Sequence, residues 1–502
     1  MNPALNIEGD RYHMSRPNII IINPDEMRWN TMGHMGNRAA STPRLDAFAQ
    51  SEAVSFENAF CQNPVCVPSR CSFFTGLYPH VNGYRTMHYL MHDGKDTMFA
   101  ELRRAGYKVW MNARNDYIAA NIPGEMATQF DEIYTYPRGG GINAKGYSII
   151  EDYPYSHYIG IVDEIKKDIG DTEAACERIM KQKDADEPLC MFLGWMNPHV
   201  PYETDQEHYD RIDPSKMEER VRLSETSGKS AMIHKLHEFA KIDGFSDEQW
   251  EELRRVYLAQ CSYVDDLFGM IIDALKKAGI YDNSAIFFLS DHGDFAGDFD
   301  LPEKAQNSFE DILTRVPLLI KPPVSEACDP GAASALTELV DFYATVMDYA
   351  EVEPGHDQFG RSLRPVIEDR TNANRKYVFS EGGRRACEKQ ADEYHKYGED
   401  GPPATSDYWA KMNAEADDFA HEKGTMIRDE RYKYVMRLSG TDEFYDLEKD
   451  PQEKINRIHE EEYASVILNM KLEMLKWYQE TCDTVQREFD SRFLTPESIQ
   501  PR

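Results

Sequence analysis

The chain has 502 residues, of which 41% are hydrophobic, and 88 Asp and Glu against 56 Lys and Arg give it a formal net charge of −32. This composition is typical of a globular protein, and no apolar run approaches the ~18 residues that a membrane-spanning helix needs. So acidic a chain repels nucleic acid, anionic membranes and long polyanions, so we expect none of these as partners. An anionic substrate would have to be small and drawn in by a locally positive pocket.

The N-terminal sequence and the cysteines indicate the cellular compartment and the redox state of the thiols. The first ten residues contain neither a basic nor an apolar signal-peptide segment, so we expect a cytoplasmic protein. The nine cysteines are an odd number and include no Cys-x-x-Cys pair. This pattern argues against a disulfide framework, a structural zinc site and a redox dithiol, and it favours reduced thiols. The oligomeric state stays open between a monomer and a homo-oligomer.

The length predicts more than one core: a large α/β domain over residues 1–370 and a smaller subdomain over residues 371–502. Three apolar runs, residues 17–23, 188–195 and 284–290, predict fully buried strands of a mostly parallel sheet with helices on both faces. The carboxyl ends of such strands are where open α/β sheets bind ligands. The residues that follow each run are therefore candidates for a functional site.

The first run ends at an acidic pair, Asp25 and Glu26. Two adjacent carboxylates at a strand end could bind a cation or could cap a helix, and the residues alone do not decide between these. Further along, Thr42 and Pro43 stand at the N-cap and first position of a predicted helix.

Cys66, Pro68 and Arg70 lie where the next helix is predicted to begin. A helix N-terminus gathers unpaired N–H groups that favour an anion, and a guanidinium adds a planar fork of donors suited to an oxyanion. The pattern indicates a nucleophile beside an anion clamp. The alternative is a buried structural cysteine beside a surface arginine.

The remaining candidates follow in chain order. Arg114 and Asp116 lie beyond an apolar segment, and residues 121–160, rich in Tyr, Gly and Pro, form either an active-site lid or a packed loop. The second buried run leads to His199, held between two prolines, and a long helix of core spacing is predicted over residues 257–279.

The third run leads to Asp291 and His292, with Lys304 in the loop beyond them. Taken alone, that lysine would be a solvated surface charge.

The stretch from Cys66 to His80 resembles the signature of type I sulfatases, Cys-x-Pro-Ser-Arg followed by a Thr-Gly-x-Tyr-Pro-His-like tail. The matching positions are Cys66, Pro68, Ser69, Arg70, Thr75, Gly76 and His80. Further matches are the Pro-Asn-Ile strand before Asp25, the Pro-His-x-Pro around His199 and the Ser-Asp-His-Gly around Asp291. The resemblance covers nearly the whole chain and implies the alkaline phosphatase-like fold.

This resemblance implies that a maturing enzyme oxidises Cys66 to formylglycine, whose hydrated aldehyde is the nucleophile. It implies a calcium site formed by Asp25, Glu26, Asp291 and His292 together with the residue at position 66. Because His292 offers nitrogen, which is unusual for calcium, Mn²⁺ or Mg²⁺ are alternatives.

The resemblance also implies that Arg70, Arg114 and Lys304 bind sulfate and that His199 is the general acid. The chain departs from the family pattern at Asp116 and at Phe299, where histidines are common. The group that deprotonates the aldehyde hydrate is therefore left open between His80 and Asp116.

For the C-terminal subdomain, the resemblance implies an antiparallel sheet and a packed helix over residues 464–481. The polar stretch 382–424 is predicted to be an insertion, at the rim of the pocket.

The implied function is hydrolysis of the sulfate ester of a small alcohol, phenol or sugar. The alternative is a phosphonate monoester or phosphodiester hydrolase of the same superfamily, and the complete set of nucleophile and metal positions argues against an inactive homologue.

Overall fold

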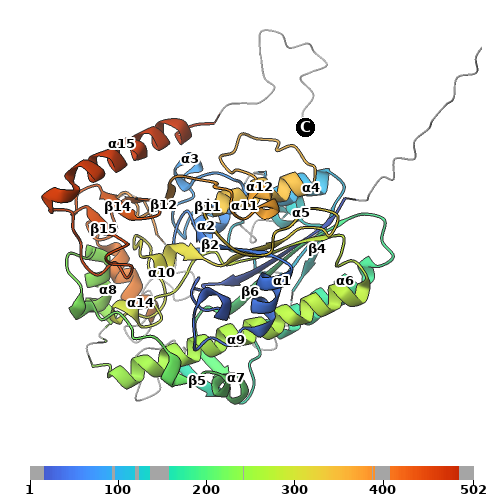
Figure 1. The fold of residues 1–502 in the computed structure, drawn as a ribbon, viewed down its shortest axis with the longest axis horizontal. Helices are drawn as coiled ribbons and strands as arrows, with labels where there is room; N and C mark the ends of the chain where they lie inside the picture. The colour runs from blue at the N-terminus through green and yellow to red at the C-terminus, as the bar shows by residue number, and fades with distance from the viewer. Residues whose placement is uncertain are drawn as a thin grey trace, which may run out of the picture.

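The computed structural model describes residues 16–92, 96–112, 114–118, 124–135, 158–240, 242, 244–386, 388–390 and 407–484. Most of the predicted lid, residues 121–160, and part of the predicted insertion therefore lie outside the described residues. The fold is the predicted mixed α/β arrangement, with a large mostly parallel sheet and a small antiparallel one (Figure 1).

The large sheet has nine strands within the described residues, in the order β11-β2-β10-β8-β1-β6-β3-β4, with β9 paired to β2. Its strands are β1 (Asn18–Asp25), β2 (Val54–Phe60), β3 (Lys108–Asn112), β4 (Glu132–Tyr134), β6 (Leu189–Pro198), β8 (Ser284–Leu289), β9 (Arg315–Val316), β10 (Leu318–Lys321) and β11 (Gly331–Glu338). Neighbours pair in parallel except where β9 and β10 are involved. A separate parallel pair joins β5 (Tyr158–Val162) to β7 (Tyr202–Asp205).

The four consecutive isoleucines of β1 explain why helices cover both faces. Side chains alternate along a strand, so Ile20 and Ile22 enter one core and Ile19 and Ile21 the other. On the first face lie α1 (Pro43–Ser51), α6 (Ile169–Gln182) and α9 (Asp247–Ala278); on the second lie α2 (Cys66–Phe73), α4 (Met98–Arg104), α11 (Leu339–Tyr349) and α12 (Arg364–Glu368) (Figure 1). Shorter helices are α3 (Pro79–Asn82), α5 (Glu125–Gln129), α7 (Gln206–Arg211), α8 (Ala231–Ala240) and α10 (Asp311–Thr314).

The small sheet has the order β12-β13-β14-β15 and is antiparallel throughout. Its strands are β12 (Val378–Gly382), β13 (Gly424–Arg428), β14 (Tyr432–Arg437) and β15 (Glu443–Asp446). Helix α15 (Ala464–Thr481) covers one face and begins and ends where the sequence predicted. Its Trp477 ring stacks on Phe379 of β12 at 4.3 Å between centroids. The insertion between β12 and β13 carries α14 (Asp407–Ala416).

The start of α1 differs in its cap from the sequence prediction. Thr42 is the N-cap residue, but its side chain makes no capping bond. The Asp265 carboxylate of α9 instead accepts hydrogen bonds from the backbone N–H of Arg44 at 3.0 Å and of Leu45 at 2.7 Å. A residue more than 200 positions away thus satisfies the helix start, which the local pattern could not reveal.

The long helix α9 also begins ten residues before its predicted start at position 257. Ser246 and Gln249 form a reciprocal capping box there. The Ser-x-x-Gln pattern of a capping box is visible in the sequence, but it lies before residue 257, where the regularly spaced apolar residues predicted the helix to start.

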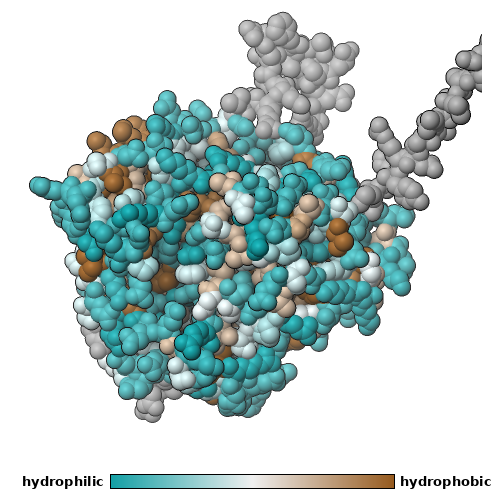
Figure 2. Space-filling view, viewed as in Figure 1, coloured by the Kyte–Doolittle hydropathy of each residue, from teal (hydrophilic) through white to brown (hydrophobic). Residues whose placement is uncertain are grey.

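The surface agrees with the composition: the face in Figure 2 is mostly hydrophilic. Among the described residues, no helix combines the length and the apolar character required to span a membrane. The eight cysteines in the described part are free thiols, and Cys387 lies outside it.

We predict that Asp265→Ala lowers the free energy of unfolding by about 2 kcal/mol, because two buried N–H groups at the start of α1 lose their acceptor. Chemical denaturation monitored by circular dichroism measures the change. The matched control is Asp266→Ala, which removes a carboxylate that is 43% exposed and pairs with Arg211, and which should cost less than about 1 kcal/mol. Equal losses for the two variants would contradict the capping role.

Candidate active site and metal centre

The carboxyl ends of four neighbouring parallel strands deliver the predicted site residues to one place. Asp25 ends β1, and Asp291 and His292 follow β8 on one side of it. His199 follows β6 and Arg114 follows β3 on the other side. The parallel pairing of β8, β1, β6 and β3 aligns these ends, so residues nearly 270 positions apart lie together.

Cys66 occupies the first position of α2, which packs on the second face of the sheet. It is buried, with a relative exposure of 3%. One turn further along, the Ser69 hydroxyl donates to the Asp291 backbone carbonyl at 2.7 Å and ties α2 to the end of β8. This contact fixes where the Cys66 side chain points.

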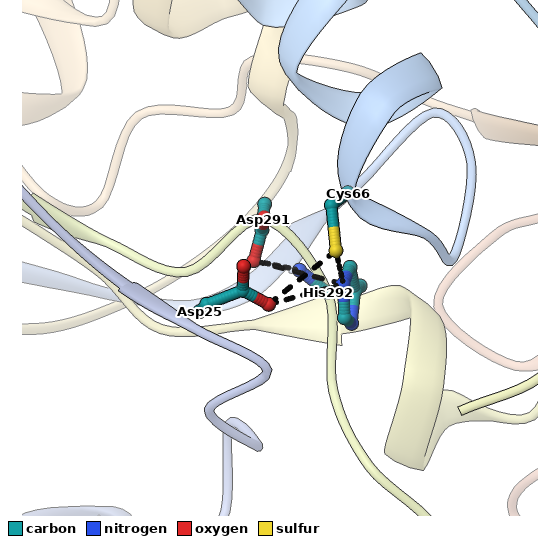
Figure 3. A group of neighbouring side chains, drawn as sticks. All are labelled: Asp25, Cys66, Asp291 and His292. Atoms are coloured by element: carbon teal, nitrogen blue, oxygen red, sulfur yellow. Dashed lines mark hydrogen bonds and ion pairs between the residues drawn. The ribbon is translucent and has the colours of Figure 1, made fainter. Parts of the chain in front are cut away.

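Asp25, Cys66, Asp291 and His292 form one buried group whose ligand atoms all lie within 4.8 Å of one another (Figure 3). Cys66 Sγ lies 3.1 Å from His292 Nε2 and 3.5 Å from Asp25 Oδ1. Figure 3 shows the thiol pointing from the start of α2 at the imidazole and the Asp25 carboxylate. The structure thus brings together four of the five residues predicted to surround a metal ion.

The orientation of His292 fits a metal ligand. Its Nδ1–H donates to the Gly293 carbonyl at 2.9 Å, which leaves the Nε2 lone pair facing the group. Burial also lowers the pKa of His292, so the imidazole stays neutral. Two carboxylate oxygens and one imidazole nitrogen suit a divalent cation, with the hard oxygens favouring Ca²⁺, Mg²⁺ or Mn²⁺.

Arg70 holds the two carboxylates in place. Its Nε donates to Asp291 Oδ2 and its Nη2 donates to Asp25 Oδ2, both at 2.8 Å. Each carboxylate thereby commits one oxygen to the guanidinium and turns the other, Oδ1, toward the group of ligands. All three side chains are completely buried.

Arg114 donates to the same Asp25 oxygen as Arg70 does. Burial alone would raise the pKa of Asp25, but Arg114, His199 and Arg70 hold it well below the ordinary value. Asp25 is therefore a carboxylate at neutral pH. Arg114 thus lies beside Asp25, and its role in binding sulfate stays a prediction. Asp116 lies 3.6 Å from both guanidinium groups.

Glu26 does not join the four-residue group. Its Oε2 accepts a hydrogen bond from Lys304 Nζ at 2.7 Å and lies 3.4 Å from His199 Nε2, so it forms a second group with Asp25 and His199. Its other oxygen is buried and has no hydrogen-bond partner among the described residues. Burial raises the pKa of Glu26 well above the ordinary value, against the opposing charge of Lys304.

His80 is not part of either group. Its Nδ1 bonds to the Glu381 carboxylate, and its Nε2 lies 2.9 Å from the Thr481 carbonyl oxygen. Its ring packs against Trp477 and Tyr478 of α15. One ring nitrogen thus bonds to β12 and the other to α15, so this geometry does not support the prediction that His80 is the base. Asp116 is the remaining predicted acceptor.

Some residues of the site escaped the sequence analysis. The Tyr202 hydroxyl donates to the Asp294 carboxylate, whose Oδ1 and Oδ2 lie 2.9 and 3.0 Å from the hydroxyl oxygen. The same hydroxyl oxygen accepts a hydrogen bond from the Glu303 N–H at 2.7 Å. It thus links the chain beyond His199 to the loop that carries Lys304. Its place next to Pro201 was a weak signal. Phe299, where a histidine is common, is packed in the hydrophobic core.

A mostly parallel sheet that gathers carboxylates, imidazoles and guanidinium groups at its strand ends is the arrangement that the resemblance to type I sulfatases implies. A model of the sulfatase family matches residues 17–352. The chain therefore belongs to the sulfatase family and is a sulfuric ester hydrolase.

Known relatives cover almost the whole chain. An arylsulfatase of Clostridium perfringens is 22% identical over 495 residues, which are 92% of this chain and 94% of the relative. A choline-sulfatase of Rhizobium meliloti is 25% identical over 505 residues, 95% of this chain and 90% of the relative. The solved phosphonate monoester hydrolase of Agrobacterium radiobacter has the same fold, with a TM-score of 0.71 at 21% identity, covering 93% and 96% of the two chains.

We predict that Asp291→Asn weakens the binding of Ca²⁺ or Mn²⁺ by about 100-fold or more, because a charged oxygen ligand and its bond from Arg70 change together. Calorimetric titration of the metal-free protein measures the affinity. Asp116→Asn is the matched control, since its carboxylate faces the same arginines but lies outside the four-residue group. Wild-type affinity in Asp291→Asn would exclude this metal site.

Proposed function

We propose that the protein hydrolyses the sulfate ester of a small alcohol, phenol or sugar, using a formylglycine made from Cys66 and a divalent metal. The observation that carries the proposal is the contact of Cys66 Sγ with His292 Nε2 and Asp25 Oδ1, at 3.1 and 3.5 Å. A reactive group at this atom would lie directly beside the metal ligands and the arginine pair.

The environment of the thiol supports its conversion. Burial raises the pKa of the Cys66 thiol well above its ordinary value, and the Asp25 carboxylate raises it further. A protonated thiol is a weak nucleophile. An aldehyde hydrate at the same carbon would offer two hydroxyl groups, of which one attacks and the other later expels the product. A maturing enzyme and an oxidant are required to make it.

Asp25, Asp291 and His292 would hold the metal, with Ca²⁺ as the preferred ion and Mn²⁺ or Mg²⁺ as alternatives. When bound, this ion would polarise a hydroxyl of the hydrate and offset charge on the sulfate oxygens. Arg114 and Lys304 supply the fixed positive charge that binds the sulfate group and stabilises its transition state.

In the first step a hydrate hydroxyl loses its proton to solvent, its oxygen attacks sulfur, and the bond from sulfur to the alcohol oxygen breaks. The imidazolium form of His199 protonates that alcohol oxygen. Burial keeps the pKa of free His199 well below its ordinary value. A bound sulfate ester adds negative charge, which favours the imidazolium form needed for this step.

In the second step the remaining hydroxyl loses its proton, with Asp116 as the nearby acceptor. The bond from carbon to the sulfate oxygen then breaks, sulfate leaves and the aldehyde re-forms. Water adds to the aldehyde and restores the hydrate. An ordinary serine ester has no second hydroxyl and could not release sulfate in this way.

A hydrolase of phosphonate monoesters or phosphodiesters is the second candidate. The Asp291–His292 ligand pair, with nitrogen as one donor, favours it, and a solved protein with this printed activity shares the fold. Both substrate classes present a tetrahedral monoanion to the same cationic pocket, so the residues described do not discriminate between them.

We predict that the peptide holding Cys66 loses the thiol mass and gains an aldehyde when the protein is expressed with a maturing enzyme. Mass spectrometry of the tryptic peptide and capture by an aldehyde-reactive probe measure the modification. Cys71, which is buried one turn away on α2, is the internal control and should keep its thiol. A persistent thiol at position 66 in active enzyme would exclude the proposed nucleophile.

Paired assays test the substrate class. We predict that formylglycine-bearing enzyme hydrolyses 4-nitrophenyl sulfate with a kcat/KM at least about tenfold above that for bis-4-nitrophenyl phosphate, and that Cys66→Ala reduces both rates to background. The opposite preference would assign the protein to the second candidate function.

A further inference from the structure

The helix α14 belongs to the insertion in the small sheet, yet it packs against the large domain. Its Trp409 ring meets Phe239 of α8 edge-on at 5.8 Å between centroids. Just beyond the helix, Asp417 lies 3.6 Å from Lys235 of α8. Ala414, on the inner side of α14, is completely buried. These contacts hold the helix over the loop that carries Lys304.

Lys411 of α14 opens a chain of alternating charges that leads into the active site. Its Nζ lies 2.9 Å from Glu303 Oε1, and the same oxygen lies 3.5 Å from Lys304 Nζ. Lys304 in turn donates to Glu26, which faces His199. The side chains of Glu303 and Lys304 are 4% and 5% exposed and that of Lys411 is 17% exposed, so solvent screens these pairs little.

The loop that carries Lys304 needs such external contacts. Five of its non-glycine residues have positive φ angles, namely Ala296, Phe299, Asp300, Glu303 and Asn307. Backbone of this kind persists only where surrounding contacts hold it. Tyr202 binds the Glu303 N–H from the large domain, and the Asn307 side chain donates to the Ala420 carbonyl of the insertion at 2.9 Å.

We propose that Lys411 is a positioning residue for sulfate binding, acting through Glu303 on Lys304. Without Lys411, the buried Glu303 carboxylate would have Lys304 as its nearest described cation and would draw it away from the substrate. With Lys411 at the shorter distance, Glu303 is neutralised and Lys304 stays directed at Glu26 and the pocket. The insertion of the small sheet thus completes the active site. This inference rests on the proposed role of Lys304 in binding the sulfate group.

The test compares Lys411→Met and Lys411→Arg with the wild type, each with formylglycine verified. We expect Lys411→Met to lower kcat/KM for 4-nitrophenyl sulfate about tenfold, mainly through KM, because Lys304 binds the sulfate group before and during the reaction. Inhibition by inorganic sulfate should weaken by a similar factor. Lys411→Arg, which keeps the charge, should restore most of both values.

The control variant is Lys235→Met, which removes a cation that pairs with the same insertion but does not touch Glu303. It should leave KM and sulfate inhibition within about twofold of the wild type. A double-mutant cycle with Glu303→Gln then tests the route. Once Glu303 is neutral, Lys411→Met should have little further effect on KM. Lys411→Gln repeats the comparison if the Met variant does not fold.

Unchanged KM and sulfate inhibition in Lys411→Met, or effects that simply add in the cycle, would overturn the inference. Failure of the proposed function gives a different result: the wild type with verified formylglycine would then cleave the phosphodiester and not the sulfate ester. The same cycle, run on the phosphodiester, would still report whether Lys411 acts through Glu303.

Discussion

The site depends on one buried guanidinium. Arg70 bridges Asp25 of β1 and Asp291 beyond β8, and no part of the three side chains reaches solvent. Two carboxylates this close together and this deeply buried would not both stay ionised without a cation between them. Pairing with a cation offsets the desolvation cost of the carboxylates only when the charged atoms are in hydrogen-bonding geometry and the remaining lone pairs of the carboxylates also have partners. The planar fork meets that condition, because it binds one oxygen of each carboxylate and leaves the other for a metal ion.

The parallel sheet makes this bridge possible. Strands β8, β1, β6 and β3 are neighbours with a common direction, so their carboxyl ends form a row that collects acids, imidazoles and an arginine. Helix α2 brings Cys66 and Arg70 to the same row and is fixed there by Ser69. The small sheet then contributes from the other side through α14. The ion pair of Lys411 with Glu303 connects this helix to the loop that carries Lys304.

Electrostatics divide the site into two functional halves. Around Cys66, deprotonated Asp25 and neutral His292 present lone pairs that suit a cation. Around Glu26, the lysines and carboxylates alternate, and burial raises the pKa of Glu26 while it lowers that of His199. This second half is suited to receive an anion and to move a proton to its leaving group.

The sequence alone predicted the buried strands, because an unbroken apolar run is typical of a strand covered on both faces. Short family motifs predicted that Asp25, Cys66, Asp291 and His292 meet, and their ligand atoms do lie within 4.8 Å of one another. Arg70 was predicted to bind sulfate, whereas its guanidinium bridges two carboxylates. It predicted α15 to the residue, but not that Asp265 caps α1. It suggested His80 as a base, whereas in the structure one nitrogen of that ring bonds to Glu381 of β12 and the other to Thr481 of α15. It associated Glu26 with the metal; the folded chain pairs this side chain with Lys304 and places it in a second possible ligand group, with Asp25 and His199. Local spacing determines which residues follow a strand or begin a helix. Only the tertiary structure decides which distant partner each charged group meets, since burial makes that partner the one that offsets its cost of desolvation.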